Sequence, residues 1–128
     1  MMKSALLIVI LSLFVASPVM AEEQIELATT SNLYSTCLDV VYKDETLATS
    51  AYCKAFIQGA VNAHTHLTSY HKFPRQYCLP SAISEKEIIR IFIRLVEENP
   101  TVIEKPAIST LYSGLNEAFP CAESPPSK

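Results

Sequence analysis

The sequence predicts an all-α fold, a small disulfide-bonded bundle of four main helices arranged as two antiparallel helical hairpins. Apolar residues recur at helical spacing in four separate stretches, and no run alternates convincingly in the manner of a β-strand. Four cysteines are spaced so that they could bridge neighbouring stretches. The longest periodic stretch contains the proline-free run from Cys53 to His66, and we take it as the central helix of one domain.

The chain begins with the pattern of an exported protein. Lys3 precedes an apolar run from Ala5 to Ala16, and small residues lead to Ala21. About 12 apolar residues are fewer than the roughly 20 that span a bilayer. We therefore expect a cleaved signal peptide over residues 1–21, a helical domain over 22–121, a short disordered tail over 122–128, and a periplasmic protein without membrane attachment after cleavage.

The charge balance argues against nucleic acid and anionic lipid as partners. Ten basic residues stand against 13 acidic ones, which gives a net charge of −3. Loss of Lys3 with the signal peptide makes the mature chain more acidic, at −4. An acidic surface repels phosphate-rich ligands.

The first helix follows a polar segment, residues 22–30, which we expect to be frayed. Ser31 or Asn32 can cap this helix, which should run to about Tyr42. Residues 43–46 form a short polar turn.

The second helix should run from about Leu47 to Ser69. Its interior contains Gly59, and a glycine there costs about 1 kcal/mol relative to alanine. This cost indicates close packing against another helix at Gly59. The alternative is a glycine that is merely tolerated.

Clear start and stop signals frame the last two helices. The sequence Ser84-Glu-Lys-Glu87 is a capping box, and Asn99-Pro100 ends the isoleucine-rich helix at about Glu98. Pro106 suits the first turn of a fourth helix, and Pro120 ends it.

The four cysteines predict two disulfides in an exported domain. The midpoint of Cys37 and Cys53 is position 45, inside the first turn, and the midpoint of Cys78 and Cys121 lies between positions 99 and 100. Residues equidistant from the turn of an antiparallel hairpin face each other, which favours Cys37–Cys53 and Cys78–Cys121. Two other connectivities remain formally possible.

Motifs for catalysis or cofactor binding are missing from the sequence. It contains no Cys-x-x-Cys, nucleophile elbow or phosphate-binding loop. His64 and His71 share a helix face, whereas His66 lies about 200° from His64 around the helix, so the spacing does not favour a metal site. We expect one packed and two exposed histidines, no metal, no cofactor and no enzymatic activity.

Four segments together resemble the Rap/Tai-type immunity proteins, small exported helical proteins associated with type VI secretion. They are Cys53-Lys-Ala-Phe-Ile-Gln-Gly-Ala-Val-Asn-Ala63, Tyr77-Cys-Leu-Pro80, the helix ending Glu98-Asn-Pro100, and Ala118-Phe-Pro-Cys121. Tyr77 stands where phenylalanine is common. The resemblance implies a periplasmic protein that binds and blocks a peptidoglycan amidase effector from a neighbouring cell. It also implies a homodimer, which the apolar girth of the third helix supports.

The loop from Tyr70 to Tyr77 is the predicted contact with such an effector, because aromatic anchors dominate tight interfaces. The predicted partner-binding residues are Tyr70, His71, Lys72, Phe73, Arg75 and Tyr77. In the alternative, its aromatic side chains fold back onto the core, and the polar face of Lys54, Gln58 and Asn62 binds the partner. The alternative function is a structural or acid-chaperone-like periplasmic protein, similar to HdeA-like chaperones, without catalytic activity.

Overall fold

The computed structural model describes residues 26–122 and confirms the all-α fold. The only strand-like pairing in this part of the chain is an isolated bridge between Thr29 and Pro106. The predicted signal peptide, and all but the first residue of the predicted tail, lie outside the described residues. The elements are α1 (Thr30–Tyr42), α2 (Ala48–Tyr70), α3 (Glu85–Glu98), a 3₁₀ turn η1 (Pro100–Val102) and α4 (Ala107–Ala118).

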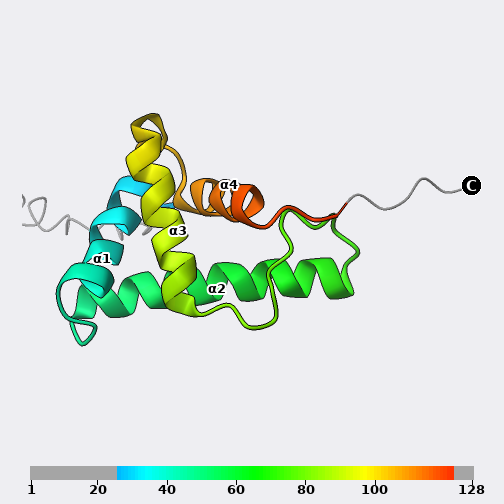
Figure 1. Cartoon of the computed structure of the whole chain (residues 1–128), viewed down its shortest axis with the longest axis horizontal. Helices are drawn as coiled ribbons and strands as arrows, with labels where there is room; N and C mark the ends of the chain where they lie inside the picture. The colour runs from blue at the N-terminus through cyan, green and yellow to red at the C-terminus, as the bar shows by residue number, and fades with distance from the viewer. Residues whose placement is uncertain (1–25, 123–128) are drawn as a thin grey trace, which may run out of the picture.

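The helices pack around the long central helix α2. Figure 1 shows α2 along the long axis of the molecule. Helices α1 and α3 run across it, and α4 lies above α2 in this view. The closest-packed pairs are α1 with α2 and α3 with α4, as the two predicted hairpins require. Within residues 26–122, none of the helices combines the length and apolar character needed to cross a bilayer.

The start of α1 is tied down rather than frayed. Thr29, and not Ser31 or Asn32, caps the helix, because its hydroxyl accepts the Asn32 backbone N–H at 3.3 Å. Thr30 is fully buried, and its Oγ1 lies 2.8 Å from both the Lys105 carbonyl oxygen and Thr110 Oγ1. The segment before α1 is therefore held by the start of α4, a contact between distant parts of the chain.

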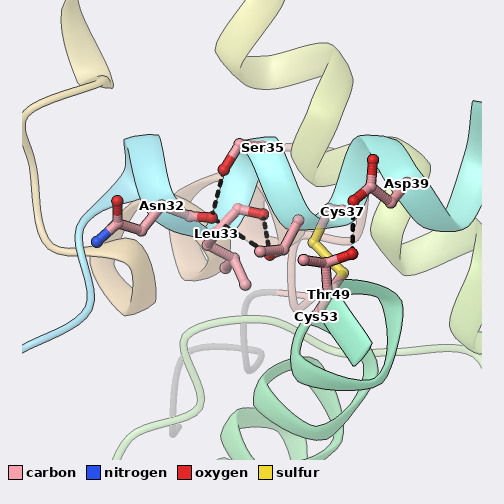
Figure 2. Close-up of a disulfide and its surroundings, with 8 residues drawn as sticks. Asn32, Leu33, Ser35, Cys37, Asp39, Thr49 and Cys53 are labelled. Carbon is pink, nitrogen blue, oxygen red and sulfur yellow. Dashed lines mark hydrogen bonds between the residues drawn. A yellow bond between two sulfur atoms is a disulfide. The ribbon is translucent and has the colours of Figure 1, made fainter. Parts of the chain in front are cut away.

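The disulfide Cys37–Cys53 joins α1 to the first turns of α2, as predicted, with 5.1 Å between the Cα atoms. Figure 2 shows the hydroxyl of Thr49 donating to Asp39 across the same junction, at 2.5 Å. Lys43 forms an ion pair with Asp39 at 2.8 Å. The hydrogen bonds from Lys43 and Thr49 lower the pKa of Asp39, so its carboxylate stays charged and continues to accept both.

The prediction of close packing at Gly59 is wrong. Gly59 is exposed, and a Cβ atom placed there would meet no heavy atom within 4 Å. The closely packed glycine is Gly114 on α4, where an added Cβ would lie 3.2 Å from Leu95 Cδ2 on α3. Helix spacing therefore depends on a small residue at the α3–α4 contact.

Helix α3 contributes more residues to the buried core than any other helix. Ser84 caps it, with its hydroxyl accepting the Glu87 backbone N–H at 3.2 Å. The apolar girth of α3 is buried within the chain itself, at Ile88, Ile89, Ile91, Phe92, Ile93 and Val96. It therefore leaves no broad apolar surface for a second copy, and our argument for a dimer from this helix is not supported.

The second disulfide closes the open end of the α3–α4 pair. Cys78, which precedes α3, is bonded to Cys121, which follows α4, as predicted. The Cys78 backbone N–H also donates to the Phe119 carbonyl oxygen at 2.9 Å. Because Pro106 forms the N-cap of α4 rather than its first turn, the helix begins one residue later than predicted.

Candidate functional site

The free end of α2 carries exposed apolar side chains beyond the packed core. Leu67, Tyr70 and Phe73 are 41, 77 and 58% exposed, and we call them the tip cluster. Leu67 and Tyr70 are neighbours three residues apart on the helix. The Phe73 backbone N–H donates to the Leu67 carbonyl oxygen at 3.3 Å, which folds the start of the loop back over the last turn. In Figure 1 the end of α2 and the loop after it project away from α1.

Tyr77, at the other end of the loop, is not a surface residue. Only 3% of it is exposed, its ring stacks on His64 with 3.9 Å between centroids, and it meets the edge of Tyr112 at 5.3 Å. Our prediction that it contacts a partner is therefore corrected, because its apolar area is used inside the fold. For this one aromatic, the alternative of folding back onto the core is right.

His64 connects the loop to α2. It is buried, and its Nε2 accepts the Gln76 backbone N–H at 3.2 Å. That bond requires an unprotonated Nε2. Burial, with a smaller contribution from the Arg75 charge, lowers the pKa of His64 and so favours the neutral ring. His64, Tyr77 and the Cys78–Cys121 disulfide together fix the C-terminal end of the loop while the tip cluster remains exposed.

The other two histidines are exposed, as predicted, but they pair in an unexpected way. The sequence places His64 and His71 on one helix face, whereas in the structure His71 lies against His66. Their Nε2 atoms are 3.3 Å apart. α2 ends at Tyr70, and His71 adopts a non-helical C-cap conformation, so the helical face no longer determines where its ring lies. In residues 26–122, no group of three or more potential metal ligands is found.

Two basic residues flank the tip cluster. Lys72 and Arg75 are both exposed. Lys72 has a positive φ of 55°, which lets the chain reverse after α2. Arg75 lies beside two shallow grooves of about 240 and 520 Å³, one with His64 and Tyr77 and one against α4. Five of the six predicted contact residues, all but Tyr77, therefore share one exposed end of the molecule.

The alternative surface on α2 is partly engaged within the chain. Lys54 lies 3.4 Å from Glu45, and the side-chain amide of Gln58 donates to Glu85. Asn62 is exposed and lines an apolar groove of about 260 Å³ with Ile57, Val61, Leu79, Ile83 and Ile88. Two of the three residues thus connect α2 to neighbouring elements.

Sequence reasoning missed Leu67 as part of the site and missed the His66–His71 contact. The exposure of Leu67 could have been suspected, because it lies one turn before Tyr70 at the end of the helix. The histidine contact depends on the backbone conformation of the C-cap, for which the sequence contains no clear signal.

Comparison with known protein families identifies a match that covers most of the chain. The family described as Rap1a immunity proteins matches residues 29–121, from the cap of α1 to the last cysteine. No significant match is found among curated proteins or among solved structures.

Proposed function

The chain belongs to the Rap1a immunity protein family, and from this we propose that it binds and blocks a peptidoglycan amidase effector of type VI secretion. Membership of the family indicates an immunity protein against a secreted effector. The amidase is the finer part of the proposal, and it rests on the resemblance of the cysteine-containing segments. The chain would act by occupying the effector's cleft, without any chemistry of its own.

The tip cluster is the observation that carries this proposal. Exposed aromatic side chains on a projecting element suit the cleft of an enzyme, because large apolar anchors contribute most of the energy of tight interfaces. Tyr70 and Phe73 project from a base that the disulfide and the Tyr77–His64 stack hold in place. A base fixed before binding lowers the conformational entropy lost on docking. We propose that Lys72 and Arg75 contact an acidic rim on the effector.

We propose a periplasmic location for the mature chain. Two disulfides are typical of oxidising compartments outside the cytoplasm. The predicted signal peptide, residues 1–21, would direct export, and intact mass measurement of the periplasmic protein should give a chain that starts at Glu22.

We also propose a homodimer, from the family resemblance rather than from α3. A groove of about 620 Å³ between α1, α3 and α4 is the surface that best supports it, since Tyr42 and Phe119 lie there beside Arg90, Arg94, Glu87 and Glu97. Charges of both signs on one face can pair with the same face of a second copy. Light scattering should give twice the mature mass, and a monomer at tens of micromolar would contradict the proposal.

The test of function is inhibition of a peptidoglycan amidase effector, sought first in the reading frame adjacent to the one that encodes this chain. Titration of the purified mature protein into a peptidoglycan amidase assay should abolish activity at a stoichiometric ratio, while an unrelated amidase stays active. A protein that leaves the neighbouring effector fully active, but binds many unfolded proteins at low pH, would instead be the chaperone-like alternative.

A further inference from the structure

We propose that His66 and His71 bind a divalent transition-metal ion, with Zn²⁺ as the ion that fits their spacing best. The proposal is independent of effector binding. It concerns two imidazoles at the end of α2, of which His71 is also one of the predicted partner-binding residues, and it can be tested without any partner.

The spacing of the two rings is the first argument. Two nitrogens bound to a tetrahedral zinc ion at about 2.0–2.1 Å lie roughly 3.3–3.4 Å apart. The Nε2 atoms of His66 and His71 are separated by 3.3 Å, with the ring planes at 60°. The two rings as they lie already give the required ligand separation, and small rotations of both would direct their lone pairs at one ion.

The chemistry of the pair is the second argument. When both rings are neutral, only one Nε2 can donate a hydrogen and the other must accept it. A metal ion can take the place of this hydrogen bond once the donating ring moves its hydrogen to Nδ1, so that both rings stay neutral and both Nε2 lone pairs bind the ion. Imidazole is a preferred ligand of zinc, copper and nickel.

The surroundings leave room for a complete coordination shell. Both histidines are exposed, so water can occupy the two remaining tetrahedral positions. The ring of Tyr70 packs on His66 with 5.1 Å between centroids and limits the orientations that His66 samples. His64 cannot join the site through Nε2, because that nitrogen accepts the Gln76 backbone N–H.

The bound ion would reversibly fix the start of the loop, where the chain leaves α2. His66 lies within α2, whereas His71 is its C-cap, where the chain leaves the helix. An ion held by both would fix the last turn of α2 and the first residue of the loop in one arrangement. Zinc should therefore raise the thermal stability of the mature protein, since a ligand that binds only the folded state stabilises it.

The experiment is a titration of the tag-free mature protein with zinc chloride, followed by calorimetry and by NMR of the histidine rings. We expect saturable binding of one ion per chain, with shifts in the His66 and His71 ring signals and none in those of His64. His66→Gln and His71→Gln should each lower zinc affinity at least roughly tenfold, because even indirect partners of metal ligands cost that much when removed.

Two controls make the result specific. Ser69→Ala alters an exposed residue of the same helical turn and keeps both rings, so it should bind zinc as the native chain does. Magnesium, which prefers oxygen ligands, should cause no ring shifts. Absence of saturable zinc binding, shifts confined to His64, or native affinity in both glutamine variants would overturn the proposal.

Discussion

The neighbouring rings of Tyr77, which is buried, and Tyr112, which is half-buried, allow two chemically identical deletions with opposite expected effects on stability. The Tyr77 hydroxyl is buried and has no hydrogen-bond partner within the described residues. The Tyr112 hydroxyl donates to the Ala60 carbonyl oxygen at 2.8 Å. Replacing each tyrosine by phenylalanine removes one oxygen and leaves the ring in place. Burial raises the pKa of both phenols, so both are neutral in the native protein at ordinary pH.

The magnitudes follow from the different environments of the two hydroxyls. An unsatisfied buried polar group costs about 1–3 kcal/mol, so Tyr77→Phe should stabilise the fold, by about 1 kcal/mol if the lower figure holds. A hydrogen bond contributes about 1 kcal/mol net, so Tyr112→Phe should destabilise by about that amount. We therefore expect the two variants to differ by about 2 kcal/mol, which is roughly 8–16 °C in unfolding temperature for a domain of this size.

The assay is urea unfolding of both variants with the disulfides intact, followed by far-UV circular dichroism. The dependence of the unfolding free energy on urea should be unchanged, because neither variant alters the surface that unfolding exposes. Equal destabilisation by both variants would refute the reasoning, because it would mean that the Tyr77 hydroxyl is satisfied in solution.

Two further predictions concern stability. The pKa of His64 is lower in the fold than its unfolded value near 6.5, so the unfolded chain is protonated first as the pH falls, and the free energy of unfolding should decrease below about pH 6.5 by at most about 1.4 kcal/mol per pH unit. His64→Gln should flatten this pH dependence in urea unfolding between pH 7.5 and 5.5, about one unit either side of that value. An unchanged pH dependence would mean that other groups cause it. Gly59→Ala should stabilise by about 1 kcal/mol, since the new methyl meets nothing, whereas Gly114→Ala should gain less, because Leu95 must move; equal gains in thermal unfolding would contradict the packing at Gly114.

Local signals in the sequence were sufficient to predict the helices and both disulfides. Helical periodicity, the Ser84 cap and the prolines act over a few residues, so the backbone follows them closely. The cysteine pairing depended only on the positions of two turns. The composition of the loop after α2 also predicted a cluster of aromatic and basic residues, and in the structure most of these residues are exposed.

Contacts between distant segments could not be predicted in this way. Thr30 is buried because the start of α4 covers it, and Tyr77 is buried because His64 and Tyr112 receive its ring. The sequence near Thr30 or Tyr77 does not specify those partners. The sequence could not show which glycine is closely packed for the same reason. The cost of a glycine within a helix is local, whereas the packing that favours one depends on which helix lies opposite.

The most direct test of the proposed function measures the affinity of the mature protein for the amidase effector under test, and compares the native chain with a variant in which Tyr70 and Phe73 are both replaced by alanine. Each anchor should cost about 2 kcal/mol or more, which is about 30-fold in affinity, so the double variant should bind roughly 1,000-fold more weakly if the two costs add, while its helices and disulfides persist. The matched control is Tyr52→Ala, an exposed aromatic on α2 away from the tip cluster, which should bind as the native chain does. Native affinity in a folded double variant would contradict the account and move the site elsewhere, first to the groove beside Asn62.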